Sequence, residues 1–223
     1  MLMDYILDIL PGLPVSLSLT FAALLVAFML SVLFTLVLSL KPKILTPIVK
    51  IYITLFTGTP LLVQFFLIYY GPGQFPALKA WPLLWELMSS PWLCALVTLA
   101  LNSAAYSTLL FHGAVRAIPQ GQWQSCQSLG MSRGQTMRII LPYAFKRALS
   151  SYSNEVVLIF KSTSLASTIT LLEVMGYSQR LFGQNYDVMV FVAAGIIYLG
   201  VNGCLTLAMR LIEHRALAFE RRN

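Results

Sequence analysis

Apolar residues occur in long uninterrupted runs along the chain, and most charged residues fall in the gaps between these runs. A helix needs about 20 consecutive, mainly apolar residues to cross the hydrocarbon core of a bilayer. Four runs reach this length without a charge, and a fifth contains Glu155 and Lys161. We therefore predict about five transmembrane helices, at residues 13–40, 51–70, 91–111, 150–172 and 188–209.

The distribution of basic residues supports the fourth predicted span, 150–172. With five spans, loops alternate between the two sides, and twelve of the fifteen Lys and Arg residues then fall on one side. Only Lys79 and Arg180 fall on the other side, because Lys161 lies within the span. Cytoplasmic loops carry the excess of Lys and Arg, so the N-terminus is predicted outside and the C-terminus in the cytoplasm. Without this span, the last basic cluster, at 210–222, would lie outside.

The composition indicates that lipid, and not water, surrounds most of the chain. Hydrophobic residues make up 58% of the 223 residues and charged residues only 10%, whereas soluble domains carry about 25% charged residues. The net charge of +7 is spread over short loops, which argues against a nucleic-acid binder. Three cysteines without a CxxC pair indicate neither a disulfide framework nor a metal site. We predict an all-α membrane protein with one transmembrane domain, residues 1–223.

The interval 118–142, between the third and fourth predicted spans, has the pattern of two short helices joined by a sharp turn. Trp123, Cys126 and Leu129 repeat every three residues and form a narrow apolar stripe on the first helix. Helices often end in a residue with positive φ, usually glycine. We therefore expect Gly130 at the C′ position of the first helix.

The second helix of this interval is predicted to begin after Ser132, which can form a capping box with Gln135. Pro142 is expected to stop or kink it, because proline lacks the backbone donor and clashes with the preceding turn. A helix pair in such a loop can dock in a groove on a partner protein or lie on the bilayer surface. The composition of the loop leaves both interpretations open.

The same loop resembles the coupling loop of ABC-importer permeases, whose consensus is Glu-Ala-Ala, three residues, Gly, then a spacer and Ile-x-Leu-Pro. The positions that match this consensus are Gln124, Ser125, Cys126, Gly130, Ile139, Leu141 and Pro142. Gln124 replaces the acid of the consensus, and the spacer is one residue shorter. The resemblance therefore implies docking on an ATPase without the salt bridge. The residues expected to couple to the ATPase are Trp123, Gln124, Cys126, Leu129, Gly130, Leu141 and Pro142.

Other stretches extend the resemblance over nearly the whole chain. Residues 57–64, Thr-Gly-Thr-Pro-Leu-Leu-Val-Gln, resemble a stretch of polar amino-acid permeases, which often have Arg at the first position. Residues 101–106, 121–123, 152–155 and 161–165 resemble the same family. The combination closely resembles the arginine-importer permease subunits of Gram-negative bacteria, and it implies the type I ABC-importer permease fold.

This resemblance implies a permease that works within an assembly in the bacterial inner membrane. Its expected partners are a second homologous permease, a dimer of ATPase subunits, a periplasmic substrate-binding protein, membrane lipid and a polar, basic amino acid, with arginine favoured. The chain has no Gly-x-x-x-x-Gly-Lys-Ser/Thr motif, the loop that cradles nucleotide phosphates. We therefore expect a transport subunit that is not an enzyme, binds no cofactor and relies on ATP bound by the partner ATPase.

Ionisable residues inside a membrane span are costly, and they are candidates for a substrate path. In the fourth predicted span, Glu155 could accept an ammonium or a guanidinium group, and Lys161 could meet a carboxylate. Alternatively, Glu155 is solvated at the membrane interface or pairs with Lys161 for structure. The polar residues predicted along the path are Glu155, Asn154, Lys161, Thr163, Ser164, Thr59 and Gln64.

Gly58 and Pro60 are expected to loosen the helix of the second predicted span. A broken helix at this depth can expose backbone groups to substrate, whereas small residues also let helices approach closely. We favour close packing as the role of Gly58. For Asn102, in the third span, we predict an interhelical hydrogen bond.

Two other classes of function compete with the ABC permease. The first is a secondary transporter or channel that works without partners, and the absence of a visible inverted repeat counts against it. The second is a membrane-embedded hydrolase, which would need a nucleophile and a base paired within the spans. No histidine is well placed for that role. Transport by this chain without any ATPase would favour the first alternative.

Overall fold

The computed structural model describes residues 1–216, and every regular element in this range is a helix. The predicted all-α class is thus confirmed. The α-helices are α1 (Leu2–Ile9), α2 (Leu13–Leu40), α3 (Leu45–Gly58), α4 (Leu61–Tyr70), α5 (Pro76–Lys79), α6 (Pro82–Ser89), α7 (Pro91–Arg116), α8 (Gln120–Ser128), α9 (Arg133–Ser162), α10 (Val174–Asn185) and α11 (Met189–Ala216). Short 3-10 helices are η1 (Leu10–Gly12), η2 (Pro72–Gln74) and η3 (Thr163–Ile169). Arg221 and Arg222, which contribute to the predicted charge asymmetry, lie outside the described residues.

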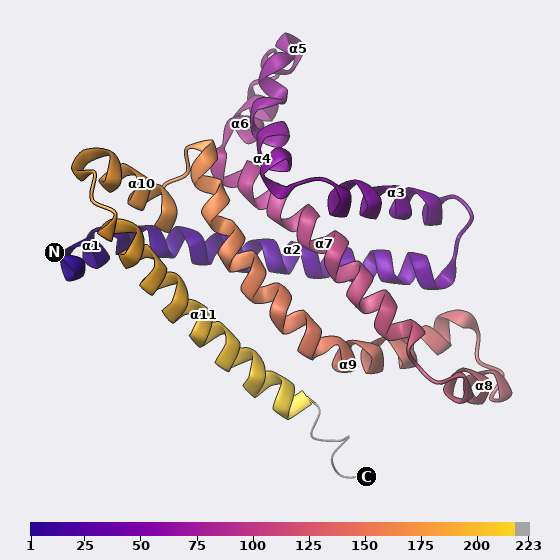
Figure 1. Cartoon of the computed structure of the whole chain (residues 1–223). Helices are drawn as coiled ribbons and strands as arrows, with labels where there is room; N and C mark the ends of the chain where they lie inside the picture. The colour runs from indigo at the N-terminus through magenta and orange to yellow at the C-terminus, as the bar shows by residue number, and fades with distance from the viewer. Residues whose placement is uncertain (217–223) are drawn as a thin grey trace.

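Helices α2, α7, α9 and α11 form the body of the molecule, and α7 and α9 both pack across α2 (Figure 1). Small and hydroxylated side chains allow this close packing, because they let membrane helices approach one another. On α2 they recur every fourth residue, and Ala23, Ala27, Ser31 and Thr35 are all buried. The opposite surface is apolar and exposed, as at Met29, which suits a surface in contact with lipid.

Within the described residues, three helical stretches are long and apolar enough to cross a membrane: Leu2–Leu40, Pro91–Arg116 and Met189–Ala216. Two bent helix pairs bring the number to five if each pair crosses as one unit. Helices α3 and α4 meet at 107°, and the stretch from α9 through η3 meets α10 at 48°.

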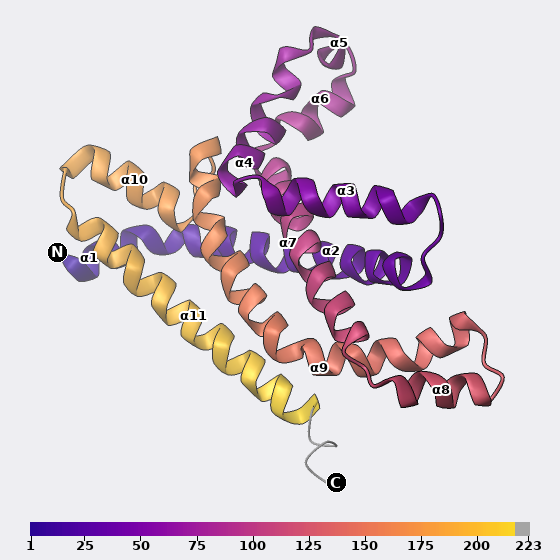
Figure 2. The same ribbon diagram turned by 45° about the vertical axis from the view of Figure 1, so that its right-hand side comes forward.

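The two ends of this bundle differ (Figures 1 and 2). One end, here called the α8 end, carries α8, the connection between α2 and α3, and the C-terminal end of α11. The other, the α10 end, carries α10 and the N-terminus, and α5 and α6 form an arm that projects beyond α4. If the bundle spans a membrane, the α8 end and the α10 end therefore lie on opposite sides of it.

Proline accounts for one break and leaves another helix intact. Thr59 and Pro60 are extended between α3 and α4, because proline cannot continue the hydrogen-bond ladder. A Cβ placed on Gly58 would meet no other described atom within 4 Å, so Gly58 does not serve close packing within this chain. Of the two outcomes expected at Pro142, a stop or a kink, the stop does not occur, since α9 continues through Pro142 to Ser162. Figure 2 shows α9 changing direction past its pairing with α8.

Candidate functional site

Glu155 is a buried acid in the middle of the bundle. It lies on α9, is only 7% exposed, and faces Ser103, which lies near the middle of α7. The neighbouring Val156 and Ile159 are buried as well. Among the residues that the structure describes, no cation forms an ion pair with Glu155. Because an isolated carboxylate is costly inside a membrane, a cationic ligand would stabilise this position.

The other polar residues predicted on α9 and on the following η3 form no hydrogen bond with Glu155 in the described part of the chain. Asn154 and Lys161 are exposed, and their spacing of seven residues places them on one face of the helix. The hydroxyls of Thr163 and Ser164 each donate to the carbonyl three residues earlier, at 2.7 and 2.8 Å. They thereby satisfy carbonyl groups that become free where α9 tightens into η3.

Polar side chains fill the break between α3 and α4. The buried Gln64 donates Nε2 to the Phe56 carbonyl at 2.9 Å and to the Thr59 hydroxyl at 2.8 Å. Asn102 of α7 donates Nδ2 to Gln64 Oε1 at 3.0 Å and to the same Phe56 carbonyl at 3.2 Å. The interhelical role predicted for Asn102 is confirmed. Gln64 braces the break by satisfying a carbonyl at the end of α3, while Thr59 remains exposed.

A second buried acid, Glu173, was missed because it lies just beyond the fourth predicted span. It is fully buried, and its Oε1 accepts a hydrogen bond of 2.8 Å from the backbone of Gly176 at the start of α10. Its Oε2 accepts from the Tyr198 hydroxyl at 2.9 Å and from the Ser16 hydroxyl at 3.2 Å. Ser16 also accepts from the backbone of Val174 at 3.3 Å. The cluster joins α2, α10 and α11 at the α10 end.

Four aromatic side chains lie on the α8 side of Glu155. Phe28 of α2, Phe111 of α7, and Phe145 and Tyr152 of α9 pack with ring centroids 4.5 to 6.1 Å apart. Tyr152 precedes Glu155 by about one helical turn. The carboxylate is thus separated from the α8 end by an apolar cluster that links three helices.

The turn after α8 has the geometry that the sequence predicts. Gly130 has a φ of 70°, and its N–H bonds to the carbonyl of Gln127 at 2.9 Å. The N–H of Met131 bonds to the carbonyl of Cys126 at 3.1 Å, which completes a Schellman motif. Helix α9 then begins with the predicted capping box of Ser132 and Gln135. This turn is therefore fixed locally by backbone geometry.

The residues predicted to couple to an ATPase divide into two groups. Trp123 is half-buried and packs against a buried cluster that joins the C-terminal end of α7 to α9 and includes Val115, Met137 and Leu141. Cys126 is buried as well, so the apolar side of α8 is held against this cluster. The residues that α8 and its turn present outward are Gln124, Leu129, Gly130 and, on α9, Pro142. Leu129 is 74% exposed. Among the described residues, no group of three His, Cys, Asp or Glu is placed to hold a metal ion.

Comparison with known proteins gives consistent matches over the whole length. A family model described as "Binding-protein-dependent transport system inner membrane component" matches residues 27–217. The chain is 68% identical to the arginine ABC transporter permease protein ArtM of Escherichia coli K12 over 220 residues, 99% of both chains. It is 55% identical to the protein of the same name in Haemophilus influenzae over 222 residues, 99% of this chain and 97% of that protein.

A solved structure shows the same fold. The structure described as an amino acid ABC transporter with histidines matches with a TM-score of 0.82 and 25% identity. The match covers 96% of this chain and 96% of that chain. The helix order, the bent α3–α4 pair and the α8 turn therefore lie within an architecture that is known from an amino acid transporter.

Proposed function

This chain belongs to the family of binding-protein-dependent transport system inner membrane components, and from that premise we propose that it passes a basic amino acid, arginine above all, through the inner membrane. It is a permease subunit of an ABC importer, a transport component and not an enzyme. Such a subunit works with an ATPase, which uses the ATP, and with a substrate-binding protein. The high identity to two arginine permeases supports arginine as the substrate.

The observation that carries the choice of a cationic substrate is the burial of Glu155. Its carboxylate lies between α7 and α9 and has no ion-pair partner in the described part of the chain. A guanidinium group can donate two parallel hydrogen bonds to a carboxylate, and an ammonium group can donate one or more. We assign Glu155 the role of holding the positive charge of the substrate as it passes the middle of the membrane.

The exposure of Asn154 and Lys161 supports the presence of a second permease subunit against the face of α9 on which both residues lie. Both are exposed on this chain alone, although a Lys in a membrane span is costly when it faces lipid. A second permease that covers this face would remove Lys161 from lipid and enclose a polar path. Lys161 would then be placed to meet the substrate carboxylate, with Thr163, Ser164, Thr59 and Gln64 as further polar groups along the path.

The α8 hairpin, α8 with the first turns of α9, is proposed as the contact with the ATPase. Its outward side offers Gln124 and the exposed Leu129, and a neutral Gln124 favours docking without a salt bridge. Trp123 and Cys126 anchor α8 on the bundle, so a displacement of α8 would be carried into α7 and α9. The excess of Lys and Arg at the α8 end supports a cytoplasmic location for this end, with the N-terminus outside.

Binding of arginine and citrulline to the purified transporter tests the role of Glu155. Citrulline has the shape of arginine and lacks its positive charge. Loss of a hydrogen bond to a charged group costs about 1.5–3 kcal/mol, so Glu155→Gln should weaken arginine binding at least about tenfold. Citrulline binding should change much less. Assembly with the ATPase should persist in this variant.

The matched control is Glu213→Gln, the same chemical change near the end of α11. It should leave both affinities unchanged. Equal losses for arginine and citrulline in Glu155→Gln would mean that the carboxylate holds the protein structure and does not pair with the substrate charge. Unchanged arginine binding in Glu155→Gln would exclude the proposed pairing. Uptake by this chain in vesicles without any ATPase would instead favour the self-sufficient transporter or channel.

A further inference from the structure

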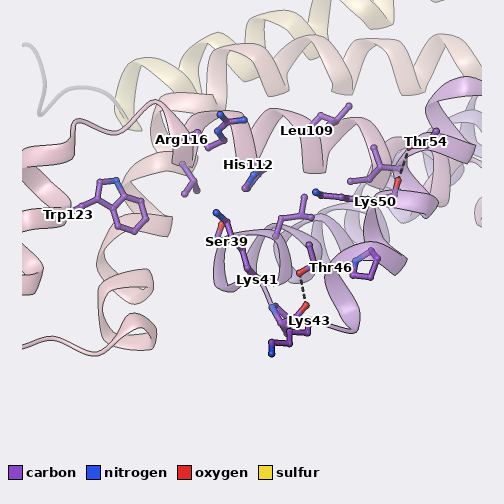
Figure 3. A pocket seen from close by; sticks show the side chains of 15 residues that line it. Ser39, Lys41, Lys43, Thr46, Lys50, Thr54, Leu109, His112, Arg116 and Trp123 are labelled. Carbon is purple, nitrogen blue, oxygen red and sulfur yellow. Dashed lines mark hydrogen bonds between the residues drawn. The ribbon is translucent and has the colours of Figure 1, made fainter.

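A pocket of about 1100 Å³ opens at the α8 end, between α2, α3, α7 and α8 (Figure 3). Four basic side chains line it: Lys41, Lys43, Lys50 and Arg116. The pocket also has an apolar wall, to which Leu38, Ile53 and Leu109 contribute. It is therefore amphipathic, with positive charge and hydrocarbon in one concave surface.

The positive charge of this pocket is not neutralised by the described part of the chain. No Asp or Glu is among the residues that line the pocket, and none of its four Lys and Arg side chains forms an ion pair with a described carboxylate. Figure 3 shows His112 between Arg116 and the end of Lys50. Cations held close together in this way raise the local concentration of anions.

Two buried polar atoms at this pocket lack a hydrogen-bond partner. Ser39 Oγ and His112 Nδ1 are inaccessible to solvent and pair with no described group. Buried polar atoms in proteins are nearly always hydrogen-bonded, to protein, water or ligand. Ser39 and His112 both line the pocket beside the unpaired cations, so a rotation of either side chain toward the pocket would let the acceptor oxygens of a ligand satisfy its buried atom.

We infer that this pocket binds the phosphate headgroup of an anionic phospholipid from the cytoplasmic leaflet. The inference rests on the proposed function for the orientation of the chain. Basic pockets between membrane helices at the cytoplasmic side suit such headgroups. The apolar wall favours a lipid over a soluble anion, and exposed apolar residues of α3 next to Lys50, such as Ile51 and Leu55, continue this surface toward the acyl chains.

A lipid in this position would also affect coupling. Trp123 lines the pocket and packs against the bases of α7 and α9. The bound headgroup would connect the α2–α3 loop, through Lys41 and Lys43, to Arg116 and α8. Occupancy of the pocket would therefore stabilise the position of α8 that the ATPase engages.

Native mass spectrometry of the intact transporter tests this inference, with phosphatidylglycerol, phosphatidylcholine or inorganic phosphate added as the probe. We expect one tightly retained phosphatidylglycerol that phosphatidylcholine and phosphate do not displace. Each basic residue near the surface contributes about a fivefold gain in affinity, so Lys50→Gln with Arg116→Gln should weaken retention about 30-fold. The matched control, Arg138→Gln with Arg147→Gln, removes two exposed charges outside the pocket and should retain the lipid.

Thr54→Glu provides a second variant that removes no cation. Thr54 lines the pocket and is exposed on α3, so a carboxylate there should expel the anionic headgroup and leave the fold intact. Equal retention of phosphatidylglycerol by this variant and the parent would overturn the inference. Displacement by inorganic phosphate would also overturn it and would assign the pocket to a soluble anion. ATP-driven uptake by the parent in vesicles that contain phosphatidylglycerol tests the proposed function separately.

Discussion

Removal of the Glu173 carboxylate should destabilise the α10 end more than any other single polar change at that end. In Glu173→Ala, the Gly176 backbone and the hydroxyls of Ser16 and Tyr198 all lose their acceptor. A buried donor left without a partner costs about 1–3 kcal/mol. Three such donors predict a loss of at least about 3 kcal/mol in the free energy of unfolding.

Tyr198→Phe separates the hydrogen bond from the rest of the cluster. It removes one donor of 2.9 Å and leaves the other two contacts of Glu173 in place. Interhelical hydrogen bonds in membrane proteins contribute about 0.6 kcal/mol on average and up to about 1.7 kcal/mol. We expect Tyr198→Phe to fall in this range. Combined with Glu173→Ala, it should add little, because the acceptor is already absent.

Equilibrium unfolding in detergent micelles, followed by tryptophan fluorescence, measures these losses. Glu86→Ala, at an exposed position of α6, is the matched control and should lie within about 0.5 kcal/mol of the parent. A loss of less than about 1 kcal/mol in the free energy of unfolding for Glu173→Ala would refute the claim that the Glu173 hydrogen bonds hold α2, α10 and α11 together. Full additivity of Glu173→Ala with Tyr198→Phe would refute it as well.

Three further changes address the other parts of the molecule. Gly130→Val should cost about 1–2 kcal/mol at the positive φ of the turn and should lower the number of amino acids taken up per ATP hydrolysed. The control Gly134→Val, at a helical position where a Cβ meets no other atom within 4 Å, should leave uptake per ATP unchanged. Equal uptake per ATP in both variants would refute the role of the turn. Gln64→Leu should destabilise the chain by about 0.5–1.5 kcal/mol, because it removes hydrogen bonds to the Phe56 carbonyl and the Asn102 amide, which keep only their bond to each other. Its effect and that of Asn102→Leu should be less than additive in unfolding measurements, and strict additivity would count against a shared brace. Leu129→Asp should weaken pull-down of the ATPase without changing the unfolding of this chain, since Leu129 is exposed at the α8 turn; unchanged pull-down would exclude Leu129 from the contact.

Local features of the fold could be predicted from the sequence because their causes lie within a few residues. The glycine at position 130 and the Ser132–Gln135 pair define the α8 turn in both the sequence and the structure. Continuous apolar runs likewise predict helices α2, α7 and α11, since their length alone is sufficient to cross a bilayer. These elements are determined by residues that lie close together in the sequence.

The roles of buried polar residues depended on contacts that are distant in the chain. Glu173 meets Ser16 across 157 positions, and no spacing rule relates two residues so far apart. Gln64 could be predicted as a polar residue within a span, but its use as a brace requires the carbonyl that becomes free when the helix breaks at Pro60. The role of Gly58 could not be predicted from the sequence either, because a residue of its small size suits both close packing and an open break in a helix.

The central claim is that this chain is the permease subunit through which a basic amino acid is imported. The most direct measurement is uptake of labelled arginine into vesicles that contain this chain, a partner permease, the ATPase and the binding protein. We predict ATP-dependent uptake that disappears when this chain is omitted and that lysine and histidine reduce by competition. Arginine uptake that continues at the same rate without this chain would contradict the account.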